Sequence, residues 1–215
     1  MVRLKIHLPV DEQTVQFCRR VNAQIQRITD SAIVFSDTSL MIPHITLVLG
    51  ELVPSQTFEE LTKITQALAQ QVKPLTLKLS QPYIDPRSYV VCAIQEDPAL
   101  TALRTSMCEN IMGAYLTTRI PRFDITHLTL AHIDAQQEEV NAYLNVIQEI
   151  PQVVCTRIEI SHIGPKGTCI DRLFATHLSR RRPSQQNSVH TRQFHGLPRT
   201  QCSRGSFTNA LDSDS

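Results

Sequence analysis

The sequence lacks three features that would each indicate a particular class of protein. None of its 215 residues belongs to a run of 18 or more apolar residues, so we expect no transmembrane helix. The N-terminus has no charged stretch followed by an apolar block, so we expect no signal peptide. The six cysteines include no Cys-x-x-Cys and no ligand pair at close spacing, which predicts neither a zinc site nor a disulfide framework. These absences predict a cytoplasmic protein with reduced thiols and no membrane partner.

The chain also has little net charge, at +1, and the charge is unevenly distributed. Residues 180–215 hold six Arg and two Asp, whereas the preceding residues hold 15 basic and 18 acidic side chains. A broadly basic nucleic-acid-binding surface is therefore not expected on the body of the protein. The polar, Arg-rich composition after Leu178 predicts a folded domain over 1–178 and a disordered tail over 179–215. The tail is interpreted either as a basic arm for RNA or, preferably, as a solvated segment without a task.

One tetrapeptide pattern occurs twice, 83 residues apart. His44-Ile45-Thr46-Leu47 is repeated as His-Leu-Thr-Leu from His127, and each copy lies in an apolar, β-branched run typical of a strand. One copy alone would be an ordinary strand pattern. Two copies indicate a duplicated unit that brings a pair of imidazoles and a pair of hydroxyls to one site.

Strand alternation assigns the motif side chains to faces. His44 and Thr46 are expected on one face, and Ile45, Leu47 and Leu49 on the other. The second motif repeats this arrangement. A face with His and Thr suits a phosphate, since hydroxyls donate hydrogen bonds to anionic oxygens. Both protonation states of imidazole are available near its ordinary pKa of about 6.5, so one His can act as base and the other as acid.

The paired motifs resemble those of the 2H phosphoesterase superfamily, and most closely its 2′,5′-RNA ligase-like branch, the RNA 2′,3′-cyclic phosphodiesterases. The opening strand through Leu8-Pro9, the Gly50 that ends the first motif strand, and Arg122-Phe123 before the second motif are similar to that branch. The resemblance extends over residues 2–178, although only the two motifs are specific.

The resemblance implies an α+β fold: a bilobal, duplicated arrangement of two antiparallel-rich sheets around a central cleft, with helices outside. It implies hydrolysis of 2′,3′-cyclic phosphate ends to 2′-phosphates without a metal or other cofactor, and some members also join RNA ends through a 2′,5′ linkage. His44 and His127 would be the acid–base pair, with the first usually the proton donor. Thr46 and Thr129 would bind phosphate.

The chain departs from the family just after the second motif. The residue after Leu130-Ala131 is often Arg in this branch, and here it is His132. Its odd separation from His127 predicts that it faces away from the cleft.

Substrate contacts are therefore expected from other residues. The first strand alternates Arg3, Lys5 and His7 with apolar residues, so these cations either line the cleft or mark a half-exposed edge strand. Arg122, and less strongly Arg87, are further phosphate contacts to consider. Tyr83 and Tyr89 are candidates for stacking on a base, although strand aromatics are most often core.

Apolar periodicity predicts an alternating order of strands and helices, with a strand, helix, motif strand, helix, strand unit appearing twice. The second helix is expected to begin with Ser55 as its N-cap. The predicted helices are 11–28, 52–71, 98–115 and 136–148. The predicted strands are 2–8, 42–49, 75–79, 89–94, 125–133, 153–163 and 169–176.

These observations predict a hydrolase, a metal-independent cyclic phosphodiesterase acting on RNA ends or cyclic nucleotides, with 2′,5′-RNA ligase activity as a related reaction. A related small substrate, such as an ADP-ribose cyclic phosphate, is not separated from these by the motifs. The alternative from another class is a non-catalytic RNA-end or nucleotide-binding module on the same fold. We expect a monomer.

Overall fold

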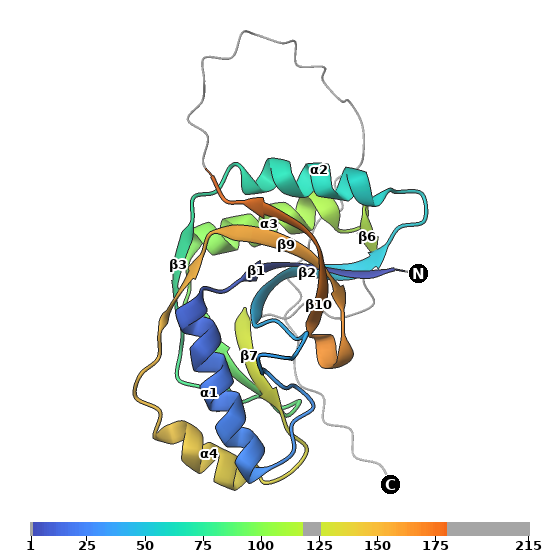
Figure 1. Cartoon of the computed structure of the whole chain (residues 1–215). Helices are drawn as coiled ribbons and strands as arrows, with labels where there is room; N and C mark the ends of the chain where they lie inside the picture. The colour runs from blue at the N-terminus through green and yellow to red at the C-terminus, as the bar shows by residue number, and fades with distance from the viewer. Residues whose placement is uncertain (1, 118–125, 180–215) are drawn as a thin grey trace, which may run out of the picture. The chain divides into compact units, whose positions relative to one another are not determined.

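A large antiparallel sheet and four helices form the part of the chain that the computed structural model describes, residues 2–117 and 126–179 (Figure 1). The predicted α+β class is confirmed. The helices are α1 (Glu12–Ile28), α2 (Phe58–Ala69), α3 (Pro98–Ile111) and α4 (Gln137–Asn145), with a 3₁₀ turn η1 (Pro165–Gly167). The strands are β1 (Arg3–Pro9), β2 (His44–Leu52), β3 (Leu75–Lys78), β4 (Tyr83–Ile84), β5 (Tyr89–Ala93), β6 (Leu116–Thr117), β7 (His127–His132), β8 (Gln152–Cys155), β9 (Arg157–Ile163) and β10 (Cys169–His177).

Side-chain caps fix where the helices begin. The Asp11 carboxylate accepts a hydrogen bond from the Thr14 backbone N–H at 3.1 Å, and Asp97 caps α3 in the same way. The second helix begins later than predicted, because Thr57 and Glu60 form a reciprocal capping box that satisfies two exposed N–H groups. Ser55 is therefore not the N-cap of α2.

The main sheet has the strand order β10-β9-β1-β2-β7-β5-β4, with β6 also paired to β2; β3 and β8 form a separate two-stranded sheet. The two antiparallel-rich sheets that the resemblance implies are thus joined edge to edge through β2 and β7 into one main sheet. The first strand lies between β9 and β2, so it is a central strand and the edge-strand interpretation is wrong. As a consequence Lys5 and His7 are buried, with 3% and 0% of their surface exposed.

Each helix that precedes a motif strand packs on the opposite half of the sheet. Helix α1, which leads into β2, packs against β7, whereas α3, which precedes β7, packs against β2. Figure 1 shows α1 beside α4 at one end and α2 beside α3 at the other. Each motif strand is therefore packed against the helix that precedes the other motif strand.

Apolar side chains from both halves form one continuous core. Leu4, Ile6 and Leu8 of β1 and Ile45 of β2 are fully buried, as is Leu128 of β7. Burying each such side chain is worth about 1.5–3 kcal/mol relative to leaving it in water. The strands that carry the motifs are therefore anchored from behind.

Two regions stay outside this description. Arg122 and the predicted strand or loop around it fall in 118–125, and nearly all of the predicted tail falls in 180–215. Within the described ranges, no helix has the length and apolar character needed to cross a membrane.

Candidate active site

The two motifs meet at equivalent positions. In the described part of the chain one residue pair joins β2 to β7, and it pairs Ile45 with Leu128, each the residue after its motif His. An antiparallel register through this pair sets His44 across from Thr129 and Thr46 across from His127. Diagonal neighbours across such a pair lie about 7–8 Å apart, with their Cβ atoms somewhat closer. Both motif His residues line one cavity, so the two imidazoles lie on the same face of the sheet.

A β-bulge lies at the last residue of each motif. Leu47 is the extra residue where β2 pairs with β1, since Val48 opposes Ile6 and Thr46 opposes His7. Leu130 occupies the same place where β7 pairs with β5. A bulge shifts the alternation of side chains by one, so residues beyond it change face.

The bulges correct two predictions from strand parity. Leu49 lines the same cavity as His44 instead of joining Ile45 and Leu47 on the opposite face. His132 lies on the Tyr89 side of β7, with its ring 4.6 Å from the Tyr89 ring in an edge-to-face arrangement. His132 thus contacts Tyr89 and lies beside the cavity, although it is not one of the lining residues. Its odd spacing from His127 does not decide which face it occupies, because the bulge breaks the alternation.

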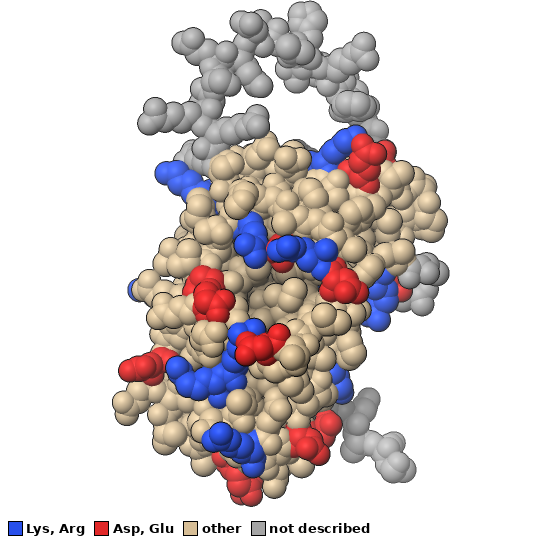
Figure 2. Space-filling model, viewed as in Figure 1, with Lys and Arg blue, Asp and Glu red and all other residues tan. Residues whose placement is uncertain are grey.

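A cavity of about 300 Å³ lies over the paired motifs. All four motif side chains line it: His44, Thr46, His127 and Thr129. Its cationic lining residues are Arg3, Lys5, Arg87 and Lys166, and among the described residues no Asp or Glu lines it. The cavity is thus a cationic pocket containing both imidazoles, whereas Figure 2 shows Lys and Arg interspersed with Asp and Glu over the outer surface in view.

A second, larger hollow of about 390 Å³ lies between α1 and residues 148–151. It is lined by Gln13, Phe17 and Arg20 among others and contains neither motif. The smaller cavity is therefore the candidate site, because the His and Thr side chains of both motifs line it.

Hydrogen bonds determine the tautomer of His44. Its Nδ1 lies 2.7 Å from the carbonyl oxygen of Ile42, and its Nε2 lies 3.0 Å from Nζ of Lys5. A carbonyl only accepts, so Nδ1 carries the proton, and the Lys5 ammonium donates to the Nε2 lone pair. Burial, followed by the positive charge of Lys5 and the neighbouring His7, holds the pKa of His44 well below its ordinary value. The ring is neutral at pH 7.

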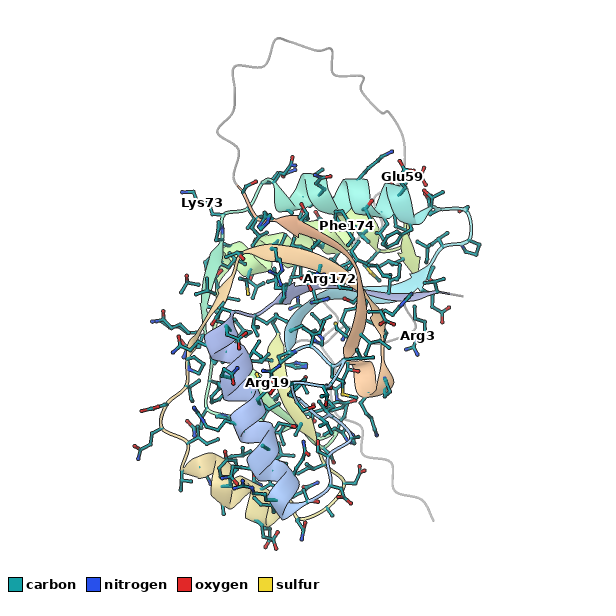
Figure 3. All side chains as sticks on the ribbon, in the orientation of Figure 1. Arg3, Arg19, Glu59, Lys73, Arg172 and Phe174 are labelled. Atoms are coloured by element: carbon teal, nitrogen blue, oxygen red, sulfur yellow. The ribbon has the colours of Figure 1, made fainter. Side chains whose placement is uncertain are left out.

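Lys5 is held by the turn between β9 and β10. Its ammonium also donates to the carbonyl oxygen of Gly167. That residue has φ +72°, a conformation that favours glycine. Burial lowers the pKa of Lys5. The predicted phosphate contacts Arg3 and Lys5 both line the cavity, and Figure 3 shows Arg3 at the outer end of β1.

His7 lies behind the site and not in it. Its Nε2 is 2.9 Å from Oγ of Ser161, and its ring contacts the His44 ring edge-on at a centroid distance of 5.1 Å. Burial, with the charges of Lys5 and Arg157, lowers its pKa to about 3. His7 is therefore a neutral packing partner of His44, so it fits neither of the two alternatives that the alternation offered, a cleft-lining group or a residue of a half-exposed edge strand.

The other end of the cavity combines one aromatic ring with two cations. The Tyr89 ring has the Arg87 guanidinium carbon 5.9 Å from its centroid, and the Arg87 side chain is paired with Asp85 at 3.1 Å. Lys166, at the tip of the turn, places its Nζ 3.4 Å from Nε2 of His132. Sequence reasoning missed Lys166; its position in a Gly-Pro-Lys-Gly turn was the available signal. Tyr83 does not line the cavity.

A metal would need a cluster of ligands. Among residues 2–117 and 126–179 no group of three or more His, Cys, Asp or Glu side chains is arranged to hold one. The chemistry available from the described groups is acid–base transfer by two imidazoles and anion binding by hydroxyls and cations.

Comparison with known proteins identifies the family and the fold. A profile of the 2′-5′ RNA ligase superfamily matches residues 17–163, more than half of the chain and both motifs. No curated protein sequence matches. Among solved structures, TT0787 of Thermus thermophilus is similar with a TM-score of 0.58 and 15% identity, covering 84% of this chain and 100% of that chain. The structure of Escherichia coli LigT complexed with 3′-AMP is similar with a TM-score of 0.52 and 16% identity, covering 83% of this chain and 99% of that chain. LigT complexed with phosphate is similar with a TM-score of 0.50 and 16% identity, covering 83% of this chain and 98% of that chain. At these identities the structures show the shared fold, and the profile shows the family: the chain belongs to the 2′-5′ RNA ligase superfamily, the 2H phosphoesterases.

Proposed function

We propose that the protein is a metal-independent phosphodiesterase that hydrolyses 2′,3′-cyclic phosphate ends of RNA or nucleotides to 2′-phosphates. The observation that carries this proposal is the shared cavity, which His44, Thr46, His127 and Thr129 line together. Two imidazoles that line one cationic cavity, one to accept a proton and the other to donate one, suit displacement at phosphorus.

The reaction follows from this arrangement. The cyclic phosphate binds between the two Thr hydroxyls and the cations of the cavity, which stabilise the charge that builds up on its oxygens. One imidazole removes a proton from water as the water oxygen bonds to phosphorus. The bond from phosphorus to the ribose 3′ oxygen breaks, and that oxygen receives a proton from the other imidazole. The product is a 2′-phosphate with a free 3′ hydroxyl, and attack by an RNA hydroxyl in place of water would give the ligase reaction.

The cavity volume supports a substrate of nucleotide size. At about 300 Å³ it is at the small end of ligand pockets, which span about 300–1,000 Å³. LigT, which shares the fold, is known in complexes with phosphate and with 3′-AMP. An RNA chain would extend beyond the cavity, so its terminal nucleotide is the part recognised.

Product analysis tests the proposal. Purified protein in EDTA is incubated with the four nucleoside 2′,3′-cyclic phosphates and with an RNA ending in one, and the products are separated from authentic 2′- and 3′-phosphates. We expect turnover with the 2′-phosphate as sole product. A non-catalytic module would instead bind these ligands without converting them, and formation of 3′-phosphate would contradict the assigned geometry.

A further inference from the structure

The contact between Lys5 and His44 distinguishes the two imidazoles of the site. Lys5 is 3% exposed, yet its ammonium lines the cavity and lies 3.0 Å from the His44 ring. A buried lysine is costly unless its N–H groups are satisfied. Two of the three are used within the protein, by the carbonyl of Gly167 and by His44 Nε2. The Lys5 ammonium is therefore held inside the protein by two specific hydrogen bonds and is not a surface cation.

We propose that Lys5 is a positioning residue that keeps His44 neutral with its Nε2 lone pair toward the cavity, so that His44 is the general base and His127 the general acid. This inference rests on the proposed phosphodiesterase function. It reverses the order that the family resemblance implies, in which the first-motif His donates the proton.

Hydrogen bonds on both sides of the His44 ring fix its tautomer. An ammonium has no lone pair, so it must donate to Nε2, while the Ile42 carbonyl requires a proton on Nδ1. A ring fixed in this way has no proton to give on its cavity side. It has a lone pair to offer once the ammonium turns to another acceptor.

The surroundings of His44 disfavour a second positive charge. The titratable groups that face it are Lys5 and His7 from β1 and His127 from β7, and each lowers its pKa. The hydrogen bond to the Ile42 carbonyl acts in the opposite direction and is outweighed. Arg3, Arg87 and Lys166 line the same cavity, and the carboxylate of Glu159 lies 4.0 Å from His7 behind it. The proton of the Lys5–His44 pair therefore resides on Lys5.

Substrate binding releases the His44 Nε2 lone pair from Lys5. A cyclic phosphate brings a negative charge to the cavity, and a phosphate oxygen accepts the N–H that Lys5 had donated to His44. Nε2 then accepts a proton from the attacking water, and His127 gives its proton to the departing 3′ oxygen. Both imidazoles return to their starting states by exchanging one proton each with solvent.

Imidazole NMR of the ligand-free protein tests the contact without any assumption about turnover. We expect the ¹⁵N spectrum at pH 7 to show His44 neutral, with the proton on Nδ1, and the Lys5→Met variant to titrate at higher pH than wild type. Lys73→Met removes an exposed lysine that Figure 3 shows far from Arg3, and it should leave the His44 titration unchanged. A wild-type His44 with its proton on Nε2, or one that is cationic at pH 7, would overturn the proposal even if Lys5→Met did not fold.

The pH dependence of kcat/KM tests the catalytic role. With His44 as base, the acidic limb of the wild-type profile follows its deprotonation, and Lys5→Met should move that limb to higher pH, so that the fractional loss of activity is largest on the acidic limb. Lys5→Arg should restore part of the wild-type profile because it retains a donor. A Lys5→Met profile that is lowered equally at every pH refutes the positioning role. Absence of turnover in wild type would refute the proposed function, while the NMR result would still stand.

Discussion

Ile45 and Leu128 face each other across β2 and β7, and this one pair joins the two halves of the main sheet in the described chain. Both side chains are fully buried, and each precedes the Thr of its motif. The backbone pairing fixes the separation of the imidazoles, and the apolar contact beneath it fixes the pairing. Stability and the placement of the two imidazoles are therefore coupled at this point.

Ile45→Ala should show that coupling. Removing a buried Ile side chain costs about 2–5 kcal/mol through lost transfer energy and an unfilled cavity. We expect a loss of that size in the free energy of unfolding, together with a lower kcat in the fraction that remains folded. Val154, which is 40% exposed, provides the control, since Val154→Ala should change stability by no more than about 0.5 kcal/mol. A stable Ile45→Ala variant would contradict the anchoring role.

Thr46→Val and Thr129→Val test the phosphate contacts. Each replacement keeps the shape of the side chain and removes the hydroxyl. A hydrogen bond to a charged group contributes about 1.5–3 kcal/mol, so each variant should weaken binding of inorganic phosphate by roughly 10- to 150-fold. Calorimetric titration measures this directly. Thr76→Val, at an exposed position on β3, should bind phosphate as wild type does, and wild-type affinity in both motif variants would remove the Thr side chains from the site.

Tyr89→Leu tests whether the aromatic end of the cavity receives the base. Stacking of a base on an aromatic ring is worth about 1–3 kcal/mol, so KM for a nucleoside 2′,3′-cyclic phosphate should rise roughly 5- to 150-fold. KM for ribose cyclic phosphate without a base should not change. Tyr83→Leu is the matched control, because Tyr83 does not line the cavity. Equal effects on the substrates with and without a base would assign Tyr89 to the core alone.

His7 should make stability depend on pH. Its pKa is about 3 in the folded protein and about 6.5 in an unfolded chain. Between these values the unfolded chain holds a proton that the folded protein lacks, so the free energy of unfolding falls as pH decreases below 6.5. One such proton gives a slope of up to about 1.4 kcal/mol per pH unit. His44 acts in the same direction, since its pKa is also lowered.

Urea unfolding from pH 7 to pH 4 measures this slope. His7→Gln should make it shallower without abolishing it, because His44 still contributes. His177→Gln, at an exposed end of β10, should leave it unchanged. A His7→Gln slope as steep as that of wild type would mean that His7 titrates normally in the folded protein.

The sequence was most informative where a pattern is local and repeated. The two motifs predicted strands that carry His and Thr on one face, and His44, Thr46, His127 and Thr129 do line one cavity. The predicted α+β class and the four helices are confirmed. The ends of the helices are shifted by a few residues, and α2 begins at the Thr57–Glu60 capping box instead of at Ser55. Periodicity and turn chemistry suffice for these features.

What the sequence could not predict depends on register and on contacts between distant segments. A bulge is set by how two strands pair, so the altered facing of Leu49 and His132 is not encoded in either strand alone. The burial of Lys5 and His7 follows from β9 pairing with β1, across more than 150 residues. The roles of Arg122 and of residues 179–215 as substrate-binding or solvated segments remain predictions.

The most direct measurement of the central claim compares His44→Ala and His127→Ala with wild type and with His177→Ala in turnover of a 2′,3′-cyclic nucleotide in EDTA. Two proton-transfer groups acting on one phosphate predict that each motif variant loses about 10²-fold or more in kcat, while His177→Ala retains wild-type activity. Activity in either motif variant equal to that of wild type would contradict the account.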